Sequence, residues 1–352
     1  MMRSTSFHRL LMCVLAFVAN QATAAVPPAP KLPADAYFLM DATTGQVLVN
    51  HNGDLSLPPA SLTKIMTSYV LAEEVDAGRA SLDDMIKVSR NAWSQNPIFN
   101  GSSLMWIEPG KPVSLADLER GVVISSGNDA SVAVAEHLAG TESSFVDVMN
   151  QLAAELGLNN TVYRNPHGLP HPEHRTTARD LATLSVALIN GHPEHYKIYK
   201  EQSFTYNGIK QYNRNSLLRS DATVDGLKTG YTSEAGYGLV ASAQREDMRL
   251  VSVVLGSASK RTRAFENSSL LNYGFRFFQN LRPLSAEVTL VEPRVWKGAA
   301  ESLHAGVLES VVLTVPRERT AADIKLTVDE QLEAPLSLSL IHISEPTRHH
   351  VI

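Results

Sequence analysis

The first third of the chain has the polar and apolar pattern of one hairpin followed by helices. Residues 37–50 contain two apolar runs around a turn at 41–45, which predicts a β-hairpin. From Ser61 onward helical spacing dominates. Ser114 and Asp117 form a capping pattern that opens a helix through Val123.

The middle of the chain continues with helices and then returns to strands. The predicted helices have capping or terminating residues and lie at 143–156 (ended by Gly157), 177–191 and 270–278. Two Val- and Leu-rich strands are expected at 237–243 and 249–255, around a polar turn at 245–247. Strands come from both ends of the region and helices from its middle. We therefore expect an α+β fold over 36–279, an antiparallel sheet with packed helices.

After Asn280 the pattern changes to short β-type runs, at 287–291, 311–315 and 324–328. They predict a small all-β domain over 280–336.

The N-terminus has the layout of an export signal. Basic residues precede an apolar run at 10–18, and Ala22-Thr23-Ala24 supplies small residues for cleavage. We expect a signal peptide at 1–24, a loose proline-rich connector at 25–35 and a location outside the cytoplasm. Because Cys13 is the single cysteine, the mature chain would have no disulfide, thiol nucleophile or cysteine metal site.

Composition narrows the class of function only slightly. The chain has 352 residues, of which 44% are hydrophobic and 19% charged, as in folded proteins. A net charge of −5 argues against a nucleic-acid partner, which would require a basic stripe.

Three short motifs carry the candidate chemistry: Ser61-Leu62-Thr63-Lys64, Ser126-Gly127-Asn128 and Lys228-Thr229-Gly230. Separately they are weak, since Ser257-Ala258-Ser259-Lys260 repeats the first pattern in a predicted loop. Ser126 could simply cap a helix, Asn128 make a turn and Lys228 face solvent. The order and context of the three motifs favour a catalytic site.

The predicted secondary structure around each motif indicates a chemical role for its residues. Ser61 is expected in the first turn of a helix, where its N–H faces an oxyanion and Lys64 is within reach as a base. Ser126 and Asn128 are expected to face one cleft as alternate residues of an extended stretch. The third motif is placed where an edge strand begins, so that Lys228 and Thr229 meet a carboxylate and Gly230 lets a substrate backbone pair alongside.

The chain resembles the low-molecular-mass penicillin-binding proteins, the D-alanyl-D-alanine carboxypeptidases. The resemblance runs from about residue 36 to 336 and is clearest at 59–66, 124–130, 224–240 and 271–278. It implies the penicillin-binding, serine β-lactamase-like transpeptidase fold, followed by a β-rich domain.

The resemblance also implies the role of each site residue. Ser61 would be the acylated nucleophile and Lys64 its base, while Ser126 would relay protons and Asn128 hold the substrate amide. Lys228, Thr229 and Arg263 would bind the terminal carboxylate, and the N–H groups of Ser61 and Tyr231 would form the oxyanion hole. Substrates would be peptidoglycan stem peptides ending in D-Ala–D-Ala, and β-lactams would acylate Ser61. No cofactor or metal is implied.

Other functions are also compatible with the sequence. A D,D-endopeptidase uses the same motifs, and a β-lactamase would need a glutamate, for which Glu173 is a poor candidate. A wall-binding module without activity is disfavoured by intact Ser61 and Lys64. His167, His171 and His174 lie in a proline-rich segment without a metal-binding pattern, which predicts a solvated loop.

The last residues, 337–352, do not resemble the family and look like sequencing read-through, so we expect truncation near Leu336. A natural frayed terminus is the alternative. Full-length family members are periplasmic, and an amphipathic helix associates them with the inner membrane. No segment here has the length for that anchor.

Overall fold

The computed structural model describes residues 26–286, 288–297, 301–302, 304–307 and 309–321, and the backbone of 331–333. The expected signal peptide, the run at 324–328 and the tail at 337–352 lie outside these residues.

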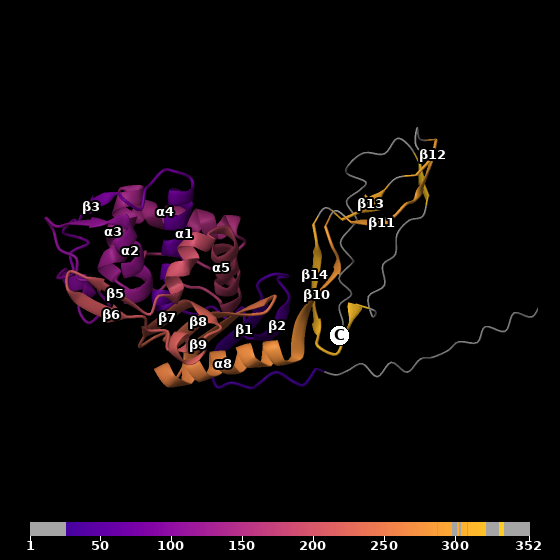
Figure 1. The fold of residues 1–352 in the computed structure, drawn as a ribbon. Coiled ribbons are helices and arrows are strands. Elements are labelled where there is room, and N and C mark those ends of the chain that lie inside the picture. Colours follow the sequence, from indigo (N-terminus) through magenta and orange to yellow (C-terminus); the bar gives the residue numbers. More distant parts are fainter. Residues whose placement is uncertain are drawn as a thin grey trace, which may run out of the picture.

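A five-stranded antiparallel sheet forms the centre of the fold, in the order β2-β1-β9-β8-β7 (Figure 1). Its strands are β1 (Ala36–Asp41), β2 (Val47–His51), β7 (Val224–Thr232), β8 (Gly236–Arg245) and β9 (Met248–Ser257). Because β1 pairs with β9, the two ends of the predicted domain meet in one sheet. The α+β prediction and the N-terminal hairpin are confirmed.

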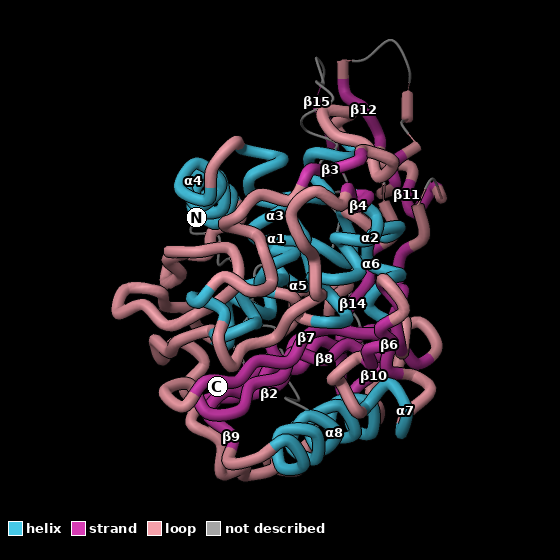
Figure 2. Tube along the Cα trace, turned by 90° about the vertical axis from the view of Figure 1, so that its left-hand side faces the viewer, coloured by secondary structure: helices cyan, strands magenta, loops and turns pink. Residues whose placement is uncertain are grey.

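Helices cover both faces of this sheet (Figure 2). On one face lie α1 (Lys64–Asp76), α2 (Leu115–Arg120), α3 (Asn128–Ala139), α4 (Glu142–Glu155) and α5 (Ala178–Gly191). On the other lies α8 (Lys260–Phe277). Alternation along the strands divides the core, so Phe38 packs with the α1 side and Leu39 with the α8 side.

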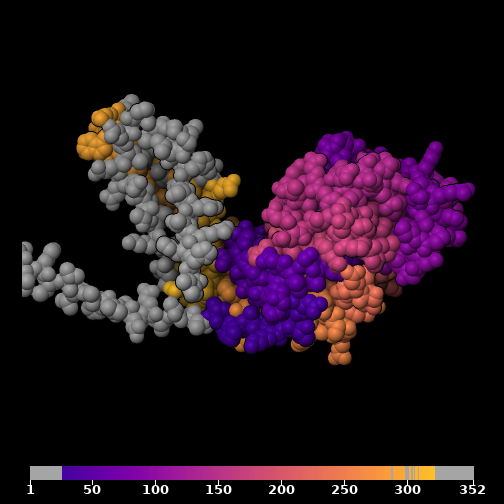
Figure 3. All heavy atoms as spheres, turned by 180° about the vertical axis from the view of Figure 1, so that it is seen from behind, coloured from indigo at the N-terminus to yellow at the C-terminus, as the bar shows by residue number. Residues whose placement is uncertain are grey.

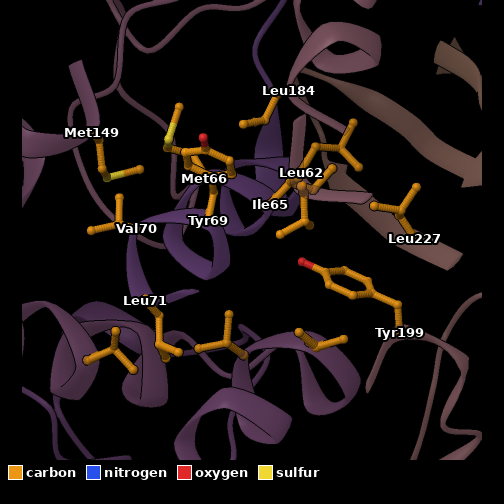
Figure 4. Packing of buried hydrophobic residues seen from close by; sticks show 14 of the residues in the cluster. Leu62, Ile65, Met66, Tyr69, Val70, Leu71, Met149, Leu184, Tyr199 and Leu227 are labelled. Atoms are coloured by element: carbon orange, nitrogen blue, oxygen red, sulfur yellow. The ribbon is translucent and has the colours of Figure 1, made fainter. Parts of the chain in front are cut away.

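Helix α1 is buried from its first residue through Ala72 and forms the middle of the larger core. Figure 4 shows its side chains Ile65, Met66 and Val70 among residues from other elements, including Met149 and Leu184. A helix enclosed on all sides is held by packing rather than by one amphipathic face. Its first residue, Lys64, is fixed in position by that packing.

Smaller elements connect these layers. The short strands are β3 (Met85–Lys87), β4 (Pro112–Ser114), β5 (Ser203–Tyr206) and β6 (Ile209–Tyr212). The short helices and helical turns are η1 (Ala60–Thr63), η2 (Pro97–Phe99), η3 (Gly121–Ser125), α6 (Pro193–Tyr196), η4 (Lys197–Lys200) and α7 (Leu217–Ser220).

The predicted helix boundaries agree where a capping residue marks them. Ser114 accepts a hydrogen bond from the N–H of Asp117, and Thr177 accepts one from the N–H of Asp180. Helix α4 ends just before Gly157, whose φ is +71°.

Three predictions about the ends of the domain were wrong. Helix α8 begins at Lys260, ten residues before the expected start, and Ser259 caps it. The segment around Ser257 is therefore not a loop, since Ser257 ends β9. The connector is not loose either, because Ala34 is buried in the α8-side core and Tyr273 donates its hydroxyl to the carbonyl of Pro27.

The C-terminal strands pair among themselves. They are β10 (Phe278–Leu284), β11 (Thr289–Val291), β12 (Arg294–Trp296), β13 (Ala305–Gly306), β14 (Val311–Pro316) and β15 (Gln331–Glu333). The pairs are β10–β14, β11–β13 and β12–β15. Figure 3 shows part of this region beside the N-terminal segment, where Thr44 Oγ1 and Thr314 Oγ1 lie 2.5 Å apart.

Candidate active site

Residues of all three motifs line one cavity of about 960 Å³. The expected site residues on its wall are Ser61, Ser126, Asn128, Thr229, Gly230, Tyr231 and Arg263. Lys64 and Lys228 are buried beside it, with exposures of 0% and 2%. Segments far apart in the sequence therefore meet as the motif order predicted.

Ser61 lies in the η1 turn directly before α1, and Lys64 is the first residue of that helix. The Lys64 Nζ atom donates to Asn128 Oδ1 and to the His167 carbonyl, both at 2.6 Å, and lies 3.4 Å from Ser61 Oγ. A neutral amine has two hydrogens and one lone pair. With both hydrogens used by these acceptors, the lone pair is left to face Ser61.

The surroundings of Lys64 favour the neutral amine. Burial lowers the pKa of Lys64 to about 7; the positive charge of Arg214 adds to this effect and Asp129 opposes it. A lysine in this range can accept a proton near neutral pH.

Ser126 and Asn128 reach the cavity by a different backbone from the one expected. Ser126 has left-handed angles, φ +58° and ψ +34°, at the end of η3, and Asn128 begins α3. The prediction of an extended stretch was wrong. Gly127 is required by crowding, since a Cβ there would lie 2.8 Å from Asp129 Oδ1 and 2.9 Å from the Met105 nitrogen.

The third motif lies on β7, which is an edge strand of the sheet as predicted. Its residues occupy the middle of the strand and not its beginning, which corrects the expected position. Burial holds the pKa of Lys228 well below its usual range, and the cations Lys64, Arg214 and Arg263 lower it further.

Two contacts hold this edge strand against its neighbours. Arg263 Nη1 donates to the carbonyls of Gly230 and Gly238, at 2.8 and 3.1 Å. A Cβ at Gly230 would lie 3.0 Å from the Pro59 carbonyl oxygen and 3.1 Å from Leu62 Cγ. The absence of a side chain at Gly230 therefore lets β7 approach the turn that carries Ser61. Tyr231 is half exposed and stacks on Tyr237, with the ring centroids 4.3 Å apart.

Sequence reasoning missed Asp129 and Arg214. The buried Asp129 carboxylate accepts the backbone N–H groups of Met105, Trp106 and Ile107 at 2.8 to 3.2 Å, which fixes the loop whose residues 100–103 line the cavity. Arg214 lines the cavity and donates to Ser103 Oγ. The position of Asp129 directly after the second motif was the one available signal.

The solvated-loop prediction for the histidines was wrong for two of the three. His167 and His174 are 3% and 2% exposed, whereas His171 faces solvent. The His167 carbonyl accepts from Lys64, and Thr67 Oγ1 donates to the Pro166 carbonyl at 2.5 Å. The segment is thus the back wall of the cavity. Within the described ranges no three His, Cys, Asp or Glu side chains are grouped to hold a metal.

Comparison with known proteins decides the family. The family model described as D-alanyl-D-alanine carboxypeptidase matches residues 20–259. The chain belongs to this family. It is 48% identical over 326 residues to D-alanyl-D-alanine carboxypeptidase DacC of Escherichia coli K12, covering 91% of this chain and 80% of that protein.

Comparison with solved structures supports the same family. Penicillin-binding protein 5 of Haemophilus influenzae superimposes with a TM-score of 0.84 at 42% identity, covering 88% of this chain and 91% of that one. Penicillin-binding protein D2 of Listeria monocytogenes, solved in an ampicillin-bound form, gives 0.63 at 32% identity, covering 70% and 99%. The fold is that of the penicillin-binding proteins, and the chain is a serine-type D-alanyl-D-alanine carboxypeptidase.

No helix in the part of the chain that the structure describes is long and apolar enough to cross a membrane.

Proposed function

We propose that this carboxypeptidase removes the terminal D-alanine from peptidoglycan stem peptides through an acyl-enzyme on Ser61. The observation that carries the assignment is the environment of Lys64. Its Nζ has two acceptors at 2.6 Å and lies 3.4 Å from Ser61 Oγ, and its pKa is lowered to about 7. This arrangement suits a base that takes the proton of the serine.

In the first step Ser61 Oγ attacks the carbonyl carbon of the penultimate D-alanine and gives its proton to Lys64. The tetrahedral intermediate collapses with cleavage of the C–N bond, and Ser126 passes a proton to the departing amine of D-alanine. Lys64 returns its proton to Ser126 and is neutral again. In the second step Lys64 takes a proton from water as the water attacks the ester, the C–O bond to Ser61 breaks and the acid is released, and Lys64 passes the proton to Ser61 Oγ. The N–H groups of Ser61 and Tyr231 stabilise the oxyanion in both steps.

The cations beside β7 suit the terminal carboxylate of the substrate. Lys228, Thr229 and Arg263 would bind it, and Asn128 would bind the amide of the peptide. The lining of the cavity includes Arg214, Lys260 and Arg263 and, among the described residues, neither Asp nor Glu. The anionic end of a substrate therefore meets positive side chains there and no carboxylate that would repel it.

The same lining bears on the β-lactamase alternative. β-Lactams resemble the dipeptide and would acylate Ser61. Glu173, the acid considered for activating water, is 66% exposed at its side chain and pairs with Arg164 at 3.1 Å. With no carboxylate on the described cavity wall, we expect the penicilloyl ester to persist.

We further assign the enzyme to the periplasm, on the basis of the export signal at 1–24, and treat 36–279 as the peptidase domain and 280–336 as a β-rich second domain. The boundary follows the change of pattern near Asn280 and the start of β10 at Phe278.

The test is release of D-alanine from a pentapeptide ending in D-Ala–D-Ala by the full chain. The Ser61→Ala variant should release none, whereas Ser257→Ala, which alters only the serine of the second S-x-x-K sequence and a residue that does not line the cavity, should match the parent. No release by a folded parent would overturn the proposal. Cleavage of cross-linked dimers in its place would establish the D,D-endopeptidase alternative.

A further inference from the structure

A buried histidine lies behind the turn that carries Ser61. His174 Nε2 is 2.9 Å from Thr63 Oγ1, and Thr63 Oγ1 is 2.8 Å from the carbonyl oxygen of Ala60. Ala60 directly precedes Ser61 and has a φ of +48°, a left-handed value that non-glycine residues keep only when their surroundings enforce it. A chain of contacts thus runs from His174 to the residue before the nucleophile.

The number of hydrogens available fixes which group donates in each of these hydrogen bonds. The Thr63 hydroxyl has one hydrogen, which it donates to the Ala60 carbonyl. It must then accept from His174, so the imidazole carries its proton on Nε2. His174 Nδ1 is buried and has no partner within the described part of the chain. A bare acceptor at that position costs less free energy than a buried, unpaired N–H would.

The imidazole is held neutral and in place. Burial, with smaller contributions from the nearby side chains of His171, Arg164, Lys64 and Arg175, lowers the pKa of His174 to about 3. The Tyr163 ring packs against it in a T-shaped arrangement, with centroids 5.7 Å apart and planes at 89°.

The segment that carries His174 is anchored at both of its ends. Leu57, just before the Ser61 turn, exchanges two backbone hydrogen bonds of 2.9 Å with Thr176. At the other end Gly168 lies against Ala60, so closely that a Cβ would be 1.8 Å from the Ala60 carbonyl oxygen. His174 lies between these anchors and adds a hydrogen bond that reaches the turn itself.

We propose that His174 is a positioning residue for acylation, whose Nε2–H orients Thr63 and thereby holds the Ala60 carbonyl and Ser61 in the attacking geometry. The proposal rests on Ser61 being the nucleophile. His174 contributes to the geometry of the turn that carries Ser61. It therefore affects the rate of acylation rather than the affinity for the ligand.

Two substitutions separate the hydrogen bond from simple packing. His174→Gln keeps an N–H donor at a similar reach, whereas His174→Leu has a similar bulk and no donor. We would measure the acylation rate constant and the dissociation constant of the preceding complex with a fluorescent penicillin, using the full chain, together with the melting temperature.

We expect His174→Leu to acylate between about 10- and 100-fold more slowly than the parent, with the dissociation constant unchanged. His174→Gln should recover to within about threefold. Equal rates for parent and His174→Leu would refute the role, and so would a His174→Gln variant as slow as His174→Leu, because packing would then be the cause.

If His174→Leu does not fold, the other partner of the bond provides the test. Thr63→Val removes the hydroxyl at constant shape and should be slow, whereas Thr63→Ser keeps it and should be near the parent rate. Equal rates for these two variants would overturn the proposal. Labelling of Ser61→Ala would instead refute the nucleophile, which distinguishes that failure from a failure at His174.

Discussion

Gly168 offers the sharpest test of how closely the back wall of the cavity controls the chemistry. The residue has a φ of +86°, and a Cβ placed on it would lie 1.8 Å from the Ala60 carbonyl oxygen, 2.4 Å from the Ala60 carbonyl carbon and 2.9 Å from Thr63 Oγ1. Cβ contacts under 3.0 Å are essentially never found. In Gly168→Ala the back wall and the Ser61 turn must therefore separate by about 1.2 Å, to bring the shortest contact from 1.8 to 3.0 Å.

That displacement acts on both reacting groups. Ala60 precedes Ser61, and His167, which precedes Gly168, accepts from Lys64. A misplacement of about 1 Å costs about 100-fold in rate. We therefore expect Gly168→Ala to reduce acylation by a fluorescent penicillin, and D-alanine release, by about 100-fold. The left-handed backbone adds about 1 kcal/mol or more of destabilisation.

Gly157→Ala is the matched control. Gly157 has a comparable φ of +71°, and a Cβ there would meet nothing within 4 Å. This variant carries the backbone strain without the collision, so it should lose about 1 kcal/mol of stability in urea unfolding and keep the parent rate of acylation. A folded Gly168→Ala that acylates within threefold of the parent would refute the argument that this contact sets the position of Ser61.

Three other outcomes are expected from the structure. The acylation rate should rise as pH increases through about 7, since Lys64 must lose its proton to act; Arg214→Gln removes a cation that lowers the pKa of Lys64, so the midpoint of the pH–rate profile should move upward. Asp129→Ala leaves the N–H groups of Met105, Trp106 and Ile107 unpaired and should cost about 3 kcal/mol or more in urea unfolding; a loss below about 1 kcal/mol would contradict the anchoring role. Arg263→Gln should raise KM about tenfold for a peptide ending in a carboxylate and change it little for the C-terminal amide; equal effects on both would argue against carboxylate binding.

The parts of the fold that local chemistry specifies could be predicted from the sequence. Ser114, Thr177 and Gly157 mark helix ends through bonds or backbone angles within a few residues, and the structure has helix ends at all three. Helix α8 was predicted at half its length because its first ten residues are mostly polar. Their burial, as at Glu266 and Asn267, comes from packing against the sheet and leaves no apolar periodicity.

The active site, like the fold, could be predicted only in part. The motifs identified Ser61, Lys64 and Lys228 by residue type and order, and the structure places them around one cavity. The back wall could not be predicted, because its contacts join distant positions through backbone atoms. His167 acts through its carbonyl, which any residue possesses, and His174 meets Thr63 across 111 positions of sequence.

The clustering of cations explains how one cavity can both bind an anion and keep a lysine unprotonated near neutral pH. Arg214 lowers the pKa of Lys64 as well as that of Lys228, and Lys64 and Arg263 lower the pKa of Lys228 too. A substrate carboxylate placed against Lys228 and Arg263 would offset part of this positive field. The pKa of Lys64 would then rise on binding, so the midpoint of the kcat–pH profile should lie above the midpoint of the kcat/KM–pH profile. A peptide with a C-terminal amide lacks that charge, so its two midpoints should coincide. The carboxylate is therefore expected to affect the pH dependence of kcat as well as KM.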